Sequence, residues 1–314
     1  MIWRERTEVT FVNILISGGT GFIGEALVRY FVQHGHTVFV LTRGETRKEA
    51  GVQYVQWMKE SAGEIAYFRN VQLNACINLA GDPIHEGRWT PEKKERILTS
   101  RIEATRRMIK IVQGMKHKPD IFIQGSAIGY YGYSKQSTFT DESLPLLNSF
   151  PSEVCEIWEN TFLMLNEPSI RKVTARIGIV LDHHGGALQK MLTPYQYFVG
   201  GRVASGEQWL SWIHLYDLVR MFHHIIDTPS IAGPVNITAP NPVKMDELGR
   251  KVSQKLQRPH WLPANEWILR LMFGEMSEFI IEGQYVLPDK ARKNGFTFLY
   301  PQLENALTEI LSRS

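Results

Sequence analysis

Short apolar runs alternate with amphipathic segments along the first half of the chain. Residues 11–17 form an apolar, β-branched run that ends at two glycines, and residues 37–41 form a second run of this kind. Between them, residues 22–34 place apolar side chains at helical spacing, with Gly35 as the expected stop. An apolar run bounded by glycine is typical of a strand buried on both faces. The pattern predicts a strand–helix–strand unit with a right-handed crossover.

The alternation continues as far as Leu181. We expect strands at 52–57, 75–79, 121–124 and 173–181, and helices at 91–113 and 152–165. Thr90 is the expected N-cap of the first of these helices, and Pro91 stands in its first turn. Repeated β–α alternation favours a parallel sheet with helices on both faces. The predicted fold class is therefore α/β, with a Rossmann-type doubly wound parallel sheet.

The pattern changes after Leu181, where glycine and proline become frequent. Short helices are expected at 215–227, 244–256 and 264–273. We interpret this part as a smaller α+β C-terminal substrate region on the carboxyl edge of the sheet, where such folds bind ligands. The predicted division is an N-terminal extension at 1–12, a nucleotide-binding Rossmann domain at 13–184 with parts of 205–240, and a smaller substrate domain at 185–204 and 241–314.

Composition excludes several classes of protein. The 43% apolar and 21% charged content of the 314 residues is that of an ordinary folded chain. A net charge of +3 does not indicate a nucleic-acid partner. Cys76 and Cys155 are too few for a disulfide framework or a Cys-rich zinc site, and we expect no metal. No apolar stretch is long enough to span a membrane, and the polar first residues lack the apolar core of a secretory signal, so we expect a cytoplasmic protein.

The strongest local motif is the glycine-rich turn between the first strand and the first helix. It comprises Gly18, Gly19, Thr20, Gly21, Phe22, Ile23 and Gly24. In this pattern the first glycine permits a tight turn, the second lets backbone N–H groups approach a pyrophosphate, and the third allows close packing of helix and strand. The phosphates would lie at the helix N-terminus, where free N–H groups and the helix dipole favour anions. The alternative is a glycine-rich turn without a ligand.

The residues after the second strand indicate which dinucleotide would bind. A carboxylate there would bind the ribose 2′-hydroxyl of NAD. The chain has Thr42 and Arg43 instead. A guanidinium can bind a 2′-phosphate through two hydrogen bonds, and a hydroxyl can donate another, so NADP(H) is favoured over NAD(H). Alternatively Arg43 is a solvated turn residue, and Glu45 nearby complicates the assignment.

Leu79, Ala80 and Gly81 close the strand predicted at 75–79, and small residues at a strand's carboxyl end leave room for a flat ring. With the glycine turn, they indicate a short-chain dehydrogenase/reductase. The chain resembles one branch of that superfamily, the atypical extended reductases of the "epimerase family". The matching segments include SGGTGFIG (17–24), INLAGDPI (77–84), GSAIGYYG (125–132), EVCEIWE (153–159), RIGIVL (176–181), SGEQWLSWIHLYDLVR (205–220) and EGQYVLP (282–288). The resemblance covers residues 13–307, and its last part resembles this branch's small C-terminal domain.

The resemblance implies NADP(H) as cofactor. It implies contacts from the glycine turn, Thr42 and Arg43, Leu79 and Ala80, and also from Glu95, Arg101 and Val180. Glu95 and Arg101 are six residues apart and do not share one helical face, so a common ligand would require a bend or long side chains. Alternatively both belong to a solvated helix surface.

Hydride transfer in this superfamily uses a Ser or Thr, a Tyr and a Lys, the last two as Tyr-x-x-x-Lys on a helix. Ser126 fits the serine. On the helix at 152–165, however, Pro151 takes the tyrosine position and Cys155 the lysine position, and neither side chain can do that chemistry. A literal Tyr-x-x-x-Lys at 131–135 lies in a Gly-Ser loop, and we interpret it as coincidence.

Three substitutes for the missing pair remain open. Tyr130 or Tyr131 would reach the nicotinamide as an acid. Cys155 would act only if its thiolate were stabilised, and a buried inert thiol is more common. Trp212 and His214 would contribute to a substrate pocket, although a histidine that opens a helix is more often structural.

The sequence predicts an NADP(H)-dependent oxidoreductase or epimerase that acts on a small carbonyl or a sugar-nucleotide-like molecule. The alternative is an NADPH-binding sensor or interaction protein with little catalysis, because the usual Tyr/Lys pair is absent. The partner we expect is a small-molecule substrate, with neither nucleic acid nor membrane, and a homodimer is compatible with the sequence.

Overall fold

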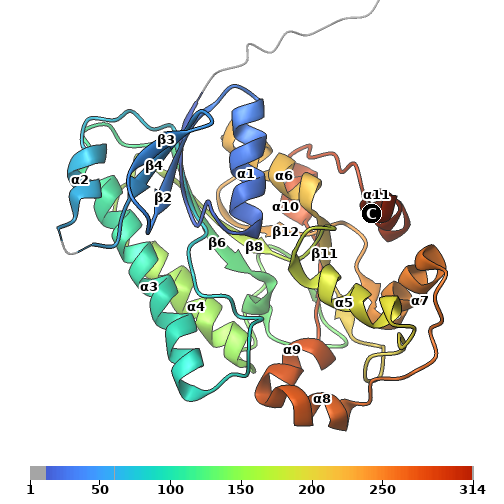
Figure 1. Cartoon of the computed structure of the whole chain (residues 1–314). Helices are drawn as coiled ribbons and strands as arrows, with labels where there is room; N and C mark the ends of the chain where they lie inside the picture. Colours follow the sequence, from blue (N-terminus) through green and yellow to red (C-terminus); the bar gives the residue numbers. More distant parts are fainter. Residues whose placement is uncertain (1–11, 60, 313–314) are drawn as a thin grey trace, which may run out of the picture.

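The computed structural model describes residues 12–59 and 61–312. Its centre is an eight-stranded sheet with the order β12-β8-β6-β5-β1-β2-β4-β3 (Figure 1). The strands are β1 (Asn13–Ser17), β2 (Thr37–Thr42), β3 (Arg47–Glu49), β4 (Val52–Gln56), β5 (Ala75–Asn78), β6 (Ile121–Ala127), β8 (Arg171–Ile177) and β12 (Gly233–Ile237). All neighbouring strands pair in parallel except β3 and β4, which are antiparallel.

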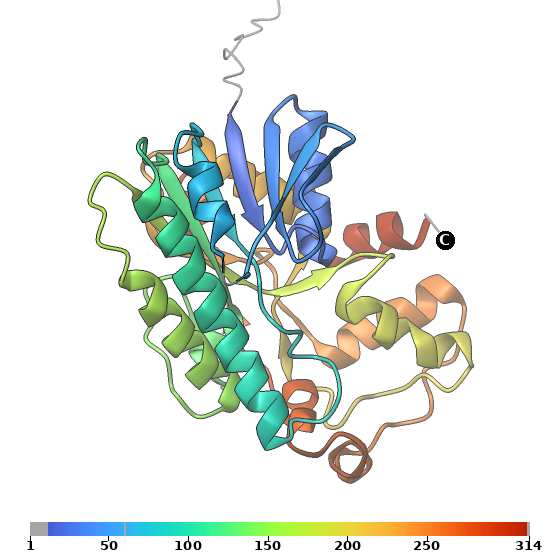
Figure 2. The same cartoon turned by 60° about the vertical axis from the view of Figure 1, so that its left-hand side comes forward.

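Helices cover both faces of this sheet (Figure 2). One face packs against α1 (Phe22–Gln33) and α6 (Leu215–Asp227), and the other against α2 (Gly63–Phe68), α3 (Pro91–Gly114) and α4 (Phe150–Leu163). The inner strands are buried on both sides, as the apolar runs in the sequence predict. The Rossmann-type doubly wound α/β fold is therefore confirmed.

The long helix α3 begins where its sequence predicts. Thr90 is the N-cap, and its hydroxyl accepts a hydrogen bond from the backbone N–H of Lys93. Pro91 is the first helical residue and needs no hydrogen bond from its nitrogen there. The start of α3 thus follows from local sequence.

The prediction of one continuous strand at 173–181 is wrong. It is divided at Gly178 into β8 and β9 (Ile179–Leu181), and β9 leaves the large sheet to pair with β11 (Trp212–His214). The backbone switches partners, because the Gly178 N–H donates to Ile237 O and the Ile179 N–H donates to Ser211 O. A side chain on Gly178 would have its Cβ 2.7 Å from Ser211 O, so glycine is needed where the two backbones meet.

The C-terminal part forms a smaller layer beside the carboxyl ends of the strands (Figure 1). Its helices are α5 (Gly186–Gln196), α7 (Met245–Leu256), α8 (Glu266–Phe273), α9 (Glu278–Ile281), α10 (Asp289–Lys293) and α11 (Leu303–Ser312), with the 3-10 helix η2 (Gly274–Ser277). Its short strands are β10 (Trp209–Leu210), β13 (Val243–Lys244) and β14 (Tyr285–Val286). β14 pairs with β7 (Thr138–Phe139), which follows the 3-10 helix η1 (Ile128–Tyr131) in the first half of the chain. The predicted helices α6, α7 and α8 are present, whereas α5 was not predicted.

The core of this layer is separate from the two cores of the large sheet. It combines apolar side chains of α5, β11, α7 and α11. Our proposed domain boundaries stay a prediction, and of the expected N-terminal extension all but Val12 lies outside the described residues. Within the described ranges, no helix is long and apolar enough to cross a membrane.

Candidate functional site

The topological switch of the large sheet lies between β1 and β5. From β1 the chain runs outward through β2 to β4, then returns to the other side of β1 as β5. In doubly wound sheets, ligands bind outside the carboxyl ends of the strands at such a point. Here those ends are Ser17, followed by the glycine-rich turn, and Asn78, followed by Leu79, Ala80 and Gly81.

The glycine-rich turn lies directly against the end of β5. Gly18 has a φ of +71°, and a Cβ there would lie 2.8 Å from the Leu79 carbonyl carbon. A Cβ on Gly24 would lie only 2.1 Å from Gly18 O. Only glycine fits at both positions, because a methyl group would displace backbone on either side. Gly19 is also confined, since its Cβ would lie 2.8 Å from a Val40 methyl carbon.

The N-terminus of α1 opens toward the turn. Its N-cap is Gly21, and among the described residues no side chain caps this end. The first N–H groups of a helix have no partner within the helix, so they remain available to an anion. Thr20 and Gly21 are exposed, and a Cβ on Gly21 would lie 3.4 Å from Gly18 O, with no other described atom outside its chain neighbours within 4 Å. Side chains of the described residues therefore do not fill this corner.

The other residues of the first helical turn pack toward the C-terminal part. The Phe22 ring lies against the glycine pair that begins α5, since a Cβ on Gly185 would lie 2.6 Å from Phe22 Cδ2. Ile23 is partly buried in the core of the sheet. Val180 is also brought here, because a Cβ on Gly186 would lie 3.0 Å from Val180 O and 2.9 Å from the Phe22 ring. Two predicted cofactor residues far apart in sequence thus lie on either side of one glycine.

Asn78 joins the strand ends beneath the turn. Its side-chain oxygen accepts a hydrogen bond from the Ser17 hydroxyl of β1, and its amide donates to Gln124 Oε1 of β6 at 2.9 Å and to Thr105 Oγ1 at 3.1 Å. All four side chains are buried. Asn78 thus ties the end of β5 to the ends of β1 and β6.

Thr42 and Arg43 lie at the carboxyl end of β2, next to the switch point. Thr42 Oγ1 accepts a hydrogen bond from the Gly44 N–H at 3.1 Å, so the hydroxyl proton remains available for donation. Arg43 is exposed, and its carbonyl accepts a hydrogen bond from the Gln56 side chain. Thr42 is partly exposed and Arg43 is exposed at this end of the strand.

Arg101 lies behind Gly81, whereas Glu95 does not. A Cβ on Gly81 would lie 2.9 Å from Arg101 Cγ, and Arg101 Nη1 donates to Asp82 O at 2.9 Å. The guanidinium also lies 5.0 Å from the centre of the Trp158 ring. Glu95 is exposed on an earlier turn of α3, and the contacts of the described residues do not join it to the glycine turn. The two therefore occupy different faces, as their spacing indicates.

Ser126 belongs to a buried ionic network at the end of β6. Its hydroxyl donates to Glu159 Oε1 at 2.7 Å. Arg176 donates to both oxygens of the same carboxylate, through Nε at 3.0 Å and Nη2 at 2.9 Å. All three side chains are buried. The Ser126 proton is therefore held by a carboxylate, and the sequence did not indicate this pairing.

Tyr130 and Tyr131 both contact the same arginine. The Tyr130 ring lies 3.5 Å from the Arg176 guanidinium carbon and is partly exposed. The Tyr131 hydroxyl accepts from Arg176 at 3.0 Å and lies 2.6 Å from Asn236 Oδ1, and the residue is fully buried. Burial raises the pKa of Tyr131 to about 12. Tyr131 is thus part of the network and keeps its proton.

Tyr133 was not among the candidate residues predicted from the sequence. Its hydroxyl is one of two buried side-chain polar atoms, the other being His36 Nε2, that lack a hydrogen-bond partner in the part of the chain that the structure describes. Burial raises its pKa, and the nearby carboxylates of Glu278 and Glu282 raise it further. Cys155 lies close to the same site, and burial raises the pKa of its thiol to about 11, so this thiol is protonated at neutral pH.

Trp212 and His214 lie in the core between β11 and α11. The Trp212 indole N–H donates to Asn241 O at 3.0 Å. His214 Nδ1 accepts from the Tyr216 N–H, its Nε2 lies 3.0 Å from Glu309 Oε2, and its ring stacks on Tyr300. Both side chains are almost fully buried, and both nitrogens of His214 are engaged. The place of both residues in a substrate pocket stays a prediction.

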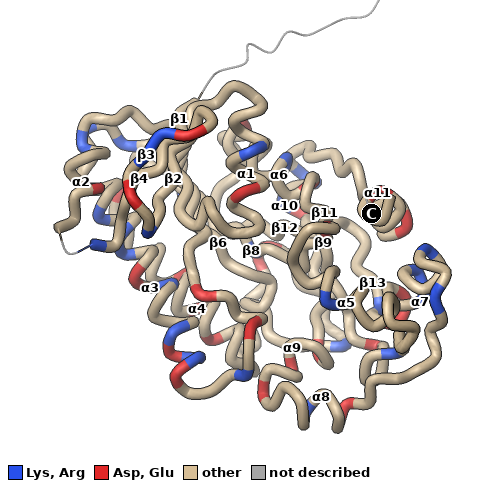
Figure 3. Tube along the Cα trace, in the orientation of Figure 1, with Lys and Arg blue, Asp and Glu red and all other residues tan. Residues whose placement is uncertain are grey.

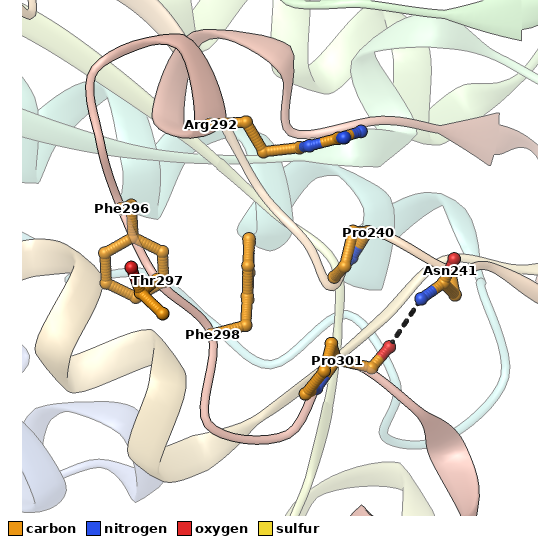
Figure 4. Close-up of a pocket in the computed structure, with 7 residues that line it drawn as sticks. All are labelled: Pro240, Asn241, Arg292, Phe296, Thr297, Phe298 and Pro301. Carbon is orange, nitrogen blue, oxygen red and sulfur yellow. Dashed lines mark hydrogen bonds between the residues drawn. The ribbon is translucent and has the colours of Figure 1, made fainter.

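A surface hollow lies elsewhere on the molecule. It has a volume of about 400 Å³ and is lined by Pro240, Asn241, Arg292, Phe296, Thr297, Phe298 and Pro301 (Figure 4). None of these residues belongs to the glycine turn or to the network around Ser126. Basic and acidic residues are interspersed over the molecule (Figure 3). The described ranges contain no group of three or more His, Cys, Asp or Glu side chains that could hold a metal.

Comparison with known proteins adds to this geometry. Residues 14–155 match the "NAD dependent epimerase/dehydratase family", and residues 265–310 match a "domain of unknown function (DUF1731)". The epimerase family protein YfhF of Bacillus subtilis (strain 168) is 41% identical over 302 residues, which cover 96% of this chain and 98% of the relative. The chain belongs to the epimerase family.

Further relatives extend the comparison to a plant and to a solved structure. The epimerase family protein SDR39U1 homolog, chloroplastic, of Arabidopsis thaliana is 38% identical over 304 residues, covering 96% of this chain and 87% of the relative. The crystal structure of human epimerase family protein SDR39U1 (isoform 2) with NADPH superposes with a TM-score of 0.87 at 28% identity, covering 96% of this chain and 100% of that one. The family assignment made from motifs is confirmed.

Proposed function

We propose that this epimerase-family protein binds NADP(H) at the carboxyl ends of β1, β2 and β5. The proposed activity is that of an oxidoreductase or epimerase of the extended short-chain reductase type, acting on a small carbonyl or a sugar-nucleotide-like molecule. The observation that carries the proposal is the uncapped, exposed N-terminus of α1 behind Gly18 and Gly24. The human family member whose structure contains NADPH supports the choice of cofactor.

The residues present fit such a dinucleotide. The free N–H groups at Phe22 and Ile23 would bind the pyrophosphate, since no side chain in the described ranges competes for the end of α1. Thr42 and Arg43 would bind the 2′-phosphate. Leu79, Ala80 and Gly81 would border the rings of the cofactor, with Arg101 behind Gly81. Cofactor contacts of Glu95 and Val180 stay predictions. When bound, the cofactor supplies or accepts a hydride.

Tyr133 is the proton donor that we propose in place of the missing Tyr/Lys pair. The Tyr131 hydroxyl is engaged by Arg176 and Asn236, and the Ser126 proton is held by Glu159. Within the described residues, the buried Tyr133 hydroxyl has no hydrogen-bond partner. Its raised pKa keeps it a phenol at neutral pH, so it holds a proton that it can donate to a carbonyl oxygen and does not act as a base. Ser126 and Tyr130 are proposed to line the reacting site.

A second candidate function is a cofactor-binding sensor or interaction protein with little catalysis. It is favoured by one observation, namely that Pro151 and a protonated Cys155 take the positions of the usual pair. Stopped-flow oxidation of bound NADPH across a panel of carbonyls and sugar nucleotides separates the two functions. Tight cofactor binding with no oxidation by any compound favours the sensor.

A cytoplasmic location and a homodimer stay predictions.

Tyr133→Phe tests the donor, with Tyr197→Phe at an exposed position as control. With a substrate from the panel, we expect Tyr133→Phe to lower the rate of NADPH oxidation by about 10²-fold or more, while the NADPH dissociation constant does not change. Thermal unfolding should show no loss of stability, because the lost hydroxyl has no partner within the described residues. Unchanged turnover would refute Tyr133 as the donor and leave cofactor binding untouched.

A further inference from the structure

We propose that Arg47 of β3 is a second ligand of the 2′-phosphate and that Glu49 competes with the phosphate for it. The inference rests on the proposed binding of NADP(H), and it adds a specificity residue that lies outside the motif at the end of β2. It also assigns a function to the short antiparallel strand β3 at the edge of the sheet.

The segment between β2 and β3 folds back onto the end of β4. The Gln56 N–H donates to Thr46 Oγ1 at 3.0 Å, and the Gln56 side chain donates to Arg43 O at 3.3 Å. Gln56 is also the register partner of Thr42 in the parallel pair of β2 and β4. These contacts hold the start of β3 beside the carboxyl end of β2, where the 2′-phosphate is proposed to bind.

The side chains of Thr42 and Arg47 both lie next to Gly44. A Cβ built on Gly44 would lie 3.5 Å from Thr42 Oγ1 and 3.8 Å from Arg47 Nη1. A group placed beside Gly44 is therefore in reach of a hydroxyl and a guanidinium together. A phosphate has several acceptor oxygens and can bind both, and the exposed Arg43 follows directly after Thr42.

The Arg47 guanidinium is oriented before any ligand binds. Its central carbon lies 4.0 Å from the centre of the Tyr54 ring, its register partner on β4, in a cation–π contact. Its Nε lies 3.2 Å from Glu49 Oε2, while Nη1 is the atom next to Gly44. Glu49 thus binds one edge of the guanidinium and leaves the other toward the phosphate position.

Glu49 opposes phosphate binding through its charge. The pair is exposed, with the Arg47 side chain 46% and the Glu49 side chain 65% accessible, so it is weak and exchanges readily with solvent. A phosphate at Gly44 would still lie close to the Glu49 carboxylate. Removing that negative charge should therefore strengthen NADPH binding, which a purely structural role of the pair would not do.

Three variants test the inference by direct titration of NADPH, NADH and the probe 2′,5′-ADP. Arg47→Ala should lower the affinity for NADPH and for 2′,5′-ADP by about tenfold and leave the affinity for NADH within about twofold of wild type. Glu49→Gln should raise the affinity for NADPH by about two- to fivefold. Lys48→Ala is the matched control, because strand alternation directs Lys48 to the opposite face while the charge removed is the same.

The outcomes separate the inference from the proposed function. If wild-type protein binds NADPH but Arg47→Ala and Lys48→Ala weaken it equally, Arg47 is not a ligand and the cofactor site stands. If Glu49→Gln weakens NADPH as Arg47→Ala does, the pair only supports the loop and the competition is disproved. Wild-type protein that binds neither NADPH nor 2′,5′-ADP overturns the inference and the proposed function together.

Discussion

Replacing Gly21 by valine should abolish dinucleotide binding without unfolding the protein. Gly21 has φ −93° and ψ 171°, a conformation that valine adopts readily, and among the described residues beyond its chain neighbours a Cβ there approaches only Gly18 O, at 3.4 Å. The expected loss of stability is about 1 kcal/mol, because valine is a poorer N-cap than glycine. The added methyl groups would occupy the open space in front of the helix N-terminus, where the pyrophosphate is proposed to lie.

The expected loss of affinity follows from the blocked N–H groups. A hydrogen bond to a charged group is worth about 1.5–3 kcal/mol, so losing two of them weakens binding by about 10²-fold or more. Titration of NADPH fluorescence measures the affinity, and thermal unfolding measures the stability. Gly24→Ala is the contrasting variant, because its Cβ would lie 2.1 Å from Gly18 O and should cost about 3 kcal/mol or more of folding stability.

The two variants together make the prediction decisive. A folded Gly21→Val protein that keeps wild-type NADPH affinity would refute the reasoning, since the phosphates would then bind away from the start of α1. A Gly24→Ala protein as stable as wild type would show that the turn is looser than its contacts indicate.

Three further predictions concern specificity, the buried network and pH. Arg43→Asp should weaken NADPH by about tenfold and favour NADH, and equal dissociation constants before and after would contradict its role. Glu159→Gln should cost about 3–5 kcal/mol in denaturant unfolding, because it leaves a buried arginine without its carboxylate; a loss below about 1 kcal/mol would contradict this. Burial lowers the pKa values of His36 and His223 below 6.5, so the unfolded chain binds protons first as the pH falls. Stability should therefore decrease below about pH 6.5, and a melting temperature equal at about pH 7 and pH 5.5 would contradict it.

Local sequence determined the elements of the nucleotide half and the place of its turn. Apolar runs and helical spacing predicted β1, α1 and β2, and Thr90 predicted the start of α3, because periodicity and capping act within a few residues. The spacing of Gly18 and Gly24 indicated close backbone contact, which the structure has at both. These features depend on neighbours along the chain, so a sequence can show them.

Tertiary structure alone decided which side chains meet. Ser126, Glu159 and Arg176 come from three separate elements. The carboxylates of Glu278 and Glu282, which raise the pKa of Tyr133 beyond the effect of burial, follow it by well over a hundred residues. The contact of His214 Nε2 with Glu309 Oε2 of α11, at 3.0 Å, likewise joins distant parts of the chain. A side chain's chemistry depends on its burial and on partners distant in sequence, and the spacing of neighbouring residues indicates neither. The sequence therefore predicted a turn suited to a dinucleotide, whereas the folded chain decided which distant side chains contact one another.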